Sequence, residues 1–166
     1  MHTFLNASDF VPTKWSTAEE KAAFGNNLLQ FMMTGFLAGR FTEKLYKRLS
    51  MCFGYIACFD RNGFAETWFD SPESIDAFVN HLMQWPCHGD PSYTFSDVEQ
   101  AVQREVEKLN LVATVNEAAA SSIQARELAL LDALESRYRR DSAIPMPRPA
   151  VPTEHIRPAE QLPLSA

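Results

Sequence analysis

Residues 71–82 read SPESIDAFVNHL, and this stretch carries the clearest helix signal in the chain. Ser71 is a favourable N-cap, Pro72 suits the first helical position, and Glu73 lies where the helix dipole favours an acidic side chain. Apolar side chains then recur at helical spacing, at positions 75, 78, 79 and 82. We therefore predict a helix with one face buried in a hydrophobic core, and this helix sets the expected fold class.

Comparable signals on both sides of this stretch predict an all-α fold, a single compact domain of about five helices. A Ser or Thr followed three residues later by Glu is a capping box, which satisfies free backbone amides at a helix start. This spacing opens the expected first helix and the expected last helical region, at Ser16 and Glu19, at Thr17 and Glu20, and at Ser96 and Glu99. From residue 97 to about residue 140 the pattern allows either one long helix or two helices joined near residues 110–116.

Residues 53–69 allow two interpretations. Asn62-Gly63 is a turn signal, so residues 55–59 and 64–69 would form the arms of a short β-hairpin. Alternatively, a second helix that begins at Thr42 continues to Phe59, and Asn62-Gly63 stops it. We favour the helix, because the apolar stripe of the second helix continues through Ile56.

The composition changes after residue 141. Six of the ten prolines lie in residues 142–166, where no periodic apolar pattern remains. Such a segment lacks the apolar surface that would offset the entropy of ordering it. We therefore predict a helical domain over residues 1–141, followed by a disordered proline-rich tail over residues 142–166.

The charge of the chain limits the possible partners. Its 15 Lys and Arg residues against 21 Asp and Glu give a net charge of −6. Broad binding to nucleic acids or to anionic membranes depends on clustered Lys and Arg, so the composition argues against both. The three cysteines are odd in number, no apolar run has the length of a membrane span, and the N-terminus does not resemble a secretory signal. These features predict a soluble cytoplasmic protein.

The segment from Asn62 to Gln103 has the most unusual composition in the chain. It is 42 residues long and contains no Lys or Arg, but it carries seven carboxylates, at Glu66, Asp70, Glu73, Asp76, Asp90, Asp97 and Glu99. A field of one sign attracts basic partners and repels phosphates. The aromatic residues Trp68, Phe69 and Trp85 within the segment would serve as interface anchors. The candidate binding residues are Glu66, Trp68, Asp70, Glu73, Asp76, Trp85 and Asp90.

The loop that follows the helix beginning at residue 71 is the strongest candidate for a catalytic or metal-binding site. The candidate metal ligands are His81, Cys87, His88 and Asp90, whose side chains are donor types that suit zinc. Their spacing matches no closed structural zinc site, and a rigid interhelical turn explains the same residues. The chain lacks the short motifs of phosphate loops, serine hydrolases and zinc proteases. We expect no cofactor and no catalytic residue.

These observations favour a non-enzymatic protein. The leading hypothesis is a small acidic interaction protein that docks on a basic protein surface, with an inhibitor or regulator of a nucleic-acid-binding protein as its most specific form. One alternative is a metal-binding protein or metal-dependent enzyme centred on residues 81–90. Another is a helical homo-oligomer with a structural role, built through residues 97–140.

Overall fold

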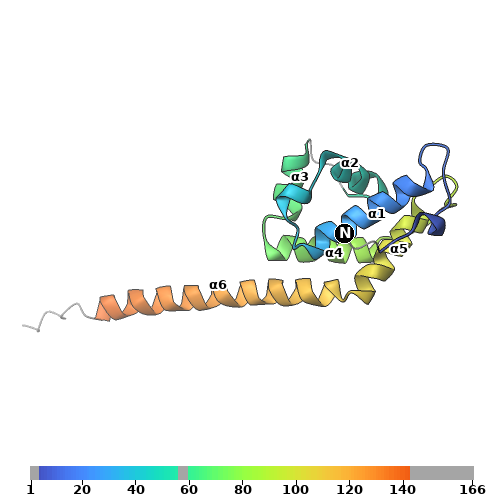
Figure 1. The fold of residues 1–166 in the computed structure, drawn as a ribbon. Coiled ribbons are helices and arrows are strands. Elements are labelled where there is room, and N and C mark those ends of the chain that lie inside the picture. Colours follow the sequence, from blue (N-terminus) through green and yellow to red (C-terminus); the bar gives the residue numbers. More distant parts are fainter. Residues whose placement is uncertain (1–3, 56–59, 143–166) are drawn as a thin grey trace, which may run out of the picture. The chain divides into compact units, whose positions relative to one another are not determined.

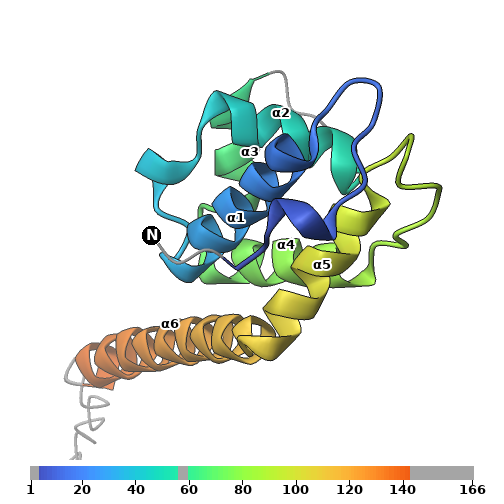
Figure 2. The same cartoon turned by 45° about the vertical axis from the view of Figure 1, so that its right-hand side comes forward.

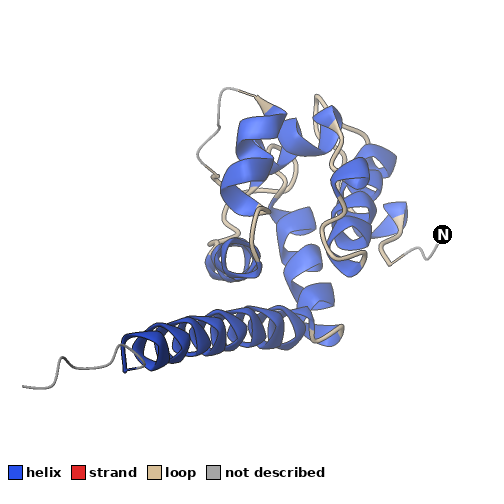
Figure 3. Ribbon diagram, turned by 90° about the vertical axis from the view of Figure 1, so that its left-hand side faces the viewer, coloured by secondary structure: helices blue, strands red, loops and turns tan. Residues whose placement is uncertain are grey.

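A computed structural model describes residues 4–55 and 60–142 of the chain (Figure 1). The described residues form helices and loops without a strand, as Figure 3 shows, so the predicted all-α fold is confirmed. In chain order the elements are η1 (Ala7–Asp9), α1 (Ala18–Met33), η2 (Ala38–Arg40), α2 (Glu43–Cys52), α3 (Arg61–Trp68), α4 (Pro72–Gln84), α5 (Ser96–Lys108) and α6 (Leu111–Ser142). The described part thus has six α-helices and two short 3₁₀ turns, where about five helices were expected.

The chain forms two units, Met1–Leu128 and Ala129–Ala166, and their boundary falls inside α6. The first unit holds the elements from η1 to α5 together with the first half of α6. The described part of the second unit is the remainder of α6. The predicted tail lies outside the described residues from position 143 onward. Among the helices of the described residues, none has both the length and the apolar character that a membrane span requires.

Helix α1 is the centre of the first unit, with α2 and α3 on one side of it and α4 and α5 on the other (Figure 2). Its residues Leu28, Leu29 and Phe31 are completely buried. The ring of Phe31 stacks on that of Phe41 at a centroid distance of 5.3 Å and meets that of Phe69 edge-on at 5.0 Å. Such aromatic pairs add to the free energy gained by burial alone. The core is therefore an aromatic cluster built around α1.

Three predicted helix starts are confirmed. Thr17 and Glu20 form the capping box of α1, the later of the two predicted pairs. The Thr42 hydroxyl accepts the Leu45 amide at the start of α2. Ser71 caps α4 with Pro72 in its first turn, and three of the four predicted apolar residues, Phe78, Val79 and Leu82, are fully buried. Local capping chemistry therefore determines where these helices begin.

Both interpretations of residues 53–69 are wrong where the structure describes them. Helix α2 ends at Cys52, and Gly54 then takes a positive φ of 59°, which ends the helix seven residues before Phe59. The ring of Trp85 lies where a Cβ of residue 54 would be, so this position requires glycine. Asn62-Gly63 is neither a turn nor a stop, because the Asp60 carboxylate accepts the Gly63 amide at 2.7 Å and caps α3. The remaining residues of the proposed hairpin, 56–59, lie outside the described residues.

The last helical region contains two helices. Helix α5 ends at Lys108, and Asn110 adopts a positive φ of 53° before α6 begins at Leu111. The predicted capping box at Ser96 and Glu99 is wrong. Phe95 occupies the N-cap position without a side-chain cap, and the Ser96 hydroxyl instead donates to the Gly89 carbonyl at 2.9 Å.

Candidate functional site

The loop of residues 85–95 joins α4 to α5 and is held in place by side chains from α1 and α5. The buried Lys21 ammonium donates to the Pro91 carbonyl at 2.8 Å and to the Asp97 carboxylate at 3.0 Å. The Gln103 amide donates to the carbonyls of Leu82 and Trp85, at 2.8 and 2.9 Å. Buried polar groups need such partners to offset their desolvation. The loop is therefore fixed at its start, by Trp85, and in its middle, by Pro91.

A cavity of about 510 Å³ lies beside this loop, between the end of α2 and the start of α5. It is larger than the hollows at α3 and at the start of α6, which measure about 250 and 270 Å³. Its lining consists of Met51, Cys52, Trp85, Pro86, His88, Tyr93, Thr94, Phe95 and Glu99. This lining is mostly apolar and aromatic, and Glu99 is its one acidic residue.

Glu99 is the unusual ionisable group of this cavity. The residue is 7% exposed, and burial raises the pKa of its carboxyl to about 7. Hydrogen bonds with the Trp85 indole and the Cys87 thiol lower the pKa, and the nearby Asp97 charge raises it. A carboxyl in this state exchanges its proton near neutral pH, which is a property of functional sites.

The cysteines of this region are poor nucleophiles. Burial raises the pKa of the Cys52 thiol to about 12 and that of the Cys87 thiol to about 11. The thiolate is the reactive form of cysteine, so both side chains are unreactive thiols near neutral pH. Cys58 lies outside the described residues.

Three of the four predicted metal ligands have separate partners, and the Cys87 thiol donates to Gln103 Oε1 at 3.3 Å. His81 Nε2 lies 3.1 Å from the Phe53 carbonyl, and the His81 ring lies 4.6 Å from that of Tyr55. The Asp90 carboxylate accepts the amide and hydroxyl of Ser92, at 2.8 and 2.6 Å. Over the described ranges, no three His, Cys, Asp or Glu side chains are grouped closely enough to hold a metal ion.

The seven carboxylates of the acidic segment do not share one face. Asp97 and Glu99 belong to the buried contacts of α5, and Asp90 stabilises its own loop. The other four lie within eleven residues at the junction of α3 and α4, as Glu66, Asp70, Glu73 and Asp76. We name these four residues the α3–α4 edge.

The α3–α4 edge borders a hollow of about 250 Å³. Exposed Glu66 and Asp70 lie at this hollow, beside apolar side chains that include Phe41, Ala65 and Phe69. The predicted anchor Trp68 lies elsewhere, half-buried with its ring 5.1 Å from that of Tyr55. Trp85, another predicted anchor, lines the larger cavity, and Phe69, the third, lines the hollow at the edge.

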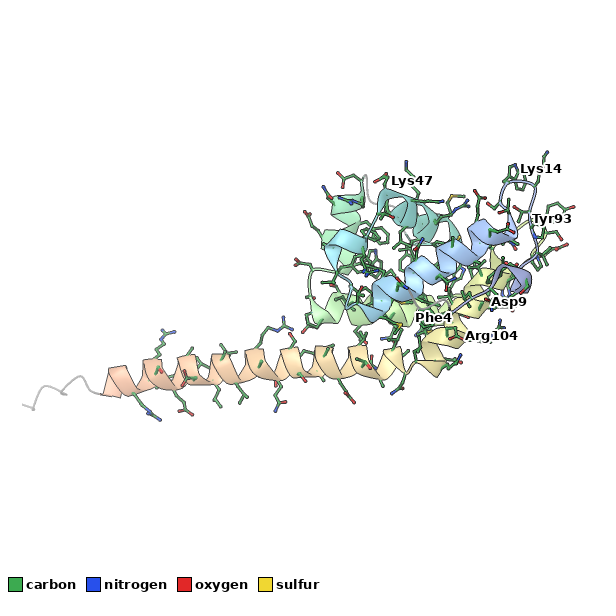
Figure 4. The ribbon with its side chains drawn as sticks, in the orientation of Figure 1. Phe4, Asp9, Lys14, Lys47, Tyr93 and Arg104 are labelled. Carbon is green, nitrogen blue, oxygen red and sulfur yellow. The ribbon has the colours of Figure 1, made fainter. Side chains whose placement is uncertain are left out.

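Sequence reasoning did not assign most residues of the cavity to a site, and Met51, Tyr93 and Glu99 are among those it missed. Met51 and Tyr93 are 73% and 71% exposed, and Figure 4 shows Tyr93 at the end of the first unit where Lys14 also lies. Glu99 was interpreted as part of a helix cap. A signal for its burial was present, because residue 99 shares a helical stripe with Val102 and Val106.

Comparison of the chain with known protein families, with curated proteins and with solved structures finds no match. The geometry of the chain is therefore the basis for the proposals that follow.

Proposed function

We propose that this chain is a non-enzymatic interaction protein that docks on a basic protein surface through the α3–α4 edge. Its most specific form is an inhibitor or regulator of a nucleic-acid-binding protein, because such a partner carries clustered Lys and Arg. The observation that carries the proposal is the position of Glu66 and Asp70 beside a hollow with apolar walls.

A hollow of this kind suits a lysine or arginine side chain. The methylene stem of such a side chain packs on apolar surface while its charged end stays near carboxylates and water. Phe41, Ala65 and Phe69 supply the apolar surface, and Glu66 and Asp70 supply the charge.

Two arginines lie near the edge, and both are engaged. Arg61 lines the hollow and donates to the Phe41 carbonyl at 3.0 Å. Arg126 pairs with Glu73 at 2.6 Å. The proposal therefore relies mainly on Glu66 and Asp70, which have no ion pair among the described residues.

Neutralising these two carboxylates tests the proposal. The double variant Glu66→Gln/Asp70→Asn is expected to bind a lysine-rich peptide about fivefold more weakly than the wild-type chain, because exposed charge pairs contribute up to about 1 kcal/mol each. Titrations at 50 and 300 mM salt measure this, and salt should weaken wild-type binding more than variant binding. The matched control is Glu107→Gln/Glu117→Gln, which removes two exposed carboxylates elsewhere. Equal losses in both double variants would contradict docking at this edge.

A specific observation favours a second function, that of a helical homo-oligomer. In the second unit, α6 exposes four large apolar side chains, which are Leu130, Leu131, Leu134 and Tyr138 at 62, 53, 42 and 68%. Such a stripe resembles the seam along which helices of two chains associate. Asp132 and Glu135 precede Arg137 and Arg139, so an antiparallel second copy would set opposite charges against each other.

The oligomer proposal predicts a mass that depends on concentration. The wild-type chain should exceed its monomer mass of 18.8 kDa as the concentration rises, whereas Leu130→Gln/Leu134→Gln should stay monomeric. Sedimentation equilibrium over a hundredfold concentration range measures both. Leu37→Gln, at an exposed leucine of the first unit, is the control and should associate like the wild type. A wild-type chain that is monomeric throughout the range would refute this function.

A further inference from the structure

We propose that the cavity beside residues 85–95 binds a small organic cation, a primary amine on an apolar or aromatic body, with the Glu99 carboxylate as its counter-ion. This site is separate from the α3–α4 edge and does not depend on the proposed function.

The volume of the cavity fits a small molecule. Ligand sites in proteins typically measure roughly 300–1,000 Å³ and are lined by apolar and aromatic side chains with a few polar groups. The cavity measures about 510 Å³, whereas the hollow at the α3–α4 edge measures about 250 Å³. Trp85, Phe95 and Tyr93 supply aromatic surface, and Met51 and Pro86 supply aliphatic surface.

The charge of the lining selects a cation. Glu99 is the acidic residue of the lining, which contains no Lys or Arg. Two cations of the surrounding structure are engaged outside the lining. The Lys21 ammonium is paired with Asp97, and the Arg48 guanidinium donates to Ser16 Oγ at 3.0 Å.

The aromatic residues add to this preference. An ammonium group gains free energy over the face of an aromatic ring. The Phe95 ring already makes two cation–π contacts within the protein, since Lys21 Nζ and the Arg48 guanidinium carbon lie 5.3 and 4.6 Å from its centroid. Tyr93, which is 71% exposed, and Trp85 remain as aromatic walls for an entering ligand.

The cation must compete with a proton for Glu99, because the pKa of this carboxyl is about 7. The other ionisable groups around it are Asp97 on the same helix, Cys52 on α2 with Arg48 and Lys21 near it, and Cys87, His88 and Tyr93 on the loop. Near pH 6 most Glu99 side chains hold the proton, and near pH 8 most are ionised. Binding is therefore expected to strengthen up to about tenfold from pH 6 to pH 8.

Titration of the full chain with phenethylammonium, followed by NMR, tests the proposal. The Trp85 indole N–H signal is the readout, because Trp85 and Glu99 both line the cavity. The signal should shift in a saturable manner at pH 8. Glu99→Gln should weaken binding about tenfold or more, because a hydrogen bond to a charged group is lost. The same substitution should abolish the dependence of binding on pH.

Two controls distinguish binding at this site from nonspecific binding of the ligand. The neutral isostere 2-phenylethanol should bind at least about tenfold more weakly than the amine, because it lacks the charge. Glu107→Gln removes an exposed carboxylate outside both the cavity and the α3–α4 edge, and it should leave the amine affinity unchanged. Equal binding of alcohol and amine, equal binding by the wild type and Glu99→Gln, or no saturable shift would each overturn the proposal. A pH dependence that survives in Glu99→Gln and disappears in His88→Gln would also overturn it.

Discussion

The Asp97→Ala variant is expected to lose about 3–5 kcal/mol of the free energy of unfolding, because it leaves a buried ammonium without its counter-ion. Lys21 has no exposed surface, and Asp97 is 13% exposed. The Asp97 carboxylate also accepts the Val11 amide at 3.0 Å, so the substitution removes a second tie to the N-terminal segment. Urea unfolding followed by circular dichroism measures the loss.

A second substitution distinguishes the unpaired charge from a general packing defect. Lys21→Met removes the ammonium and keeps most of the side-chain volume, so Lys21→Met/Asp97→Ala should recover much of the lost stability. The exposed pair of Lys47 and Glu43, at 3.4 Å, provides the comparison. Glu43→Ala should cost less than about 1 kcal/mol. A double variant as unstable as Asp97→Ala would show that the charge is not the cause.

The Glu99→Gln substitution is expected to raise the free energy of unfolding above that of the wild-type chain at pH 8. This gain should be about 2 kcal/mol larger at pH 8 than at pH 5. The pKa of Glu99 is about 7 in the folded chain and 4.5 for an ordinary glutamate. The folded state therefore holds the proton more strongly than the unfolded state. The stability from this group is fully present below pH 4.5 and is lost as the pH rises to about 7.

Glutamine imitates the protonated side chain at every pH, so Glu99→Gln does not incur this loss. Urea unfolding of both chains at pH 5 and pH 8 measures the difference. Glu66→Gln serves as the control, since Glu66 is exposed and its removal should change stability by less than about 0.5 kcal/mol. A stability difference between the wild type and Glu99→Gln that is the same at both pH values would contradict the raised pKa.

The parts of the fold that depend on local chemistry could be predicted from the sequence. Ser71 and Pro72 mark the start of α4 because a hydroxyl cap and a fixed φ act within one helical turn. The same reasoning failed at residue 63. Gly63 lies inside the first turn of α3, where its amide is the group that the Asp60 carboxylate accepts. A turn signal and a helix start use the same small set of residues, and only the tertiary context separates them.

The candidate sites depend on contacts between distant residues, and the sequence could not supply these. Asp97 meets Lys21 across 76 positions of the chain. Glu99 is buried beside Trp85 and Cys87 of the 85–95 loop and Cys52 of α2. The acidic segment alone did not show whether its carboxylates form one face, and the packing of the helices buries part of them and leaves Glu66 and Asp70 at a separate edge. Composition gave the sign of the charge, and packing decided where it is exposed.

The exposure of the second half of α6 affects the free energy of any association in which this segment takes part. From Ala129 to Arg139 every side chain is exposed except that of Ser136, which is half-buried. A helical segment of this length is only marginally stable in water without tertiary packing, and alanines and the Glu135–Arg139 pair contribute just tenths of a kcal/mol each. We therefore expect this segment to populate a local helix–coil equilibrium. A partner that covers its leucines would shift this equilibrium, and part of the binding free energy would be spent on fixing the helix.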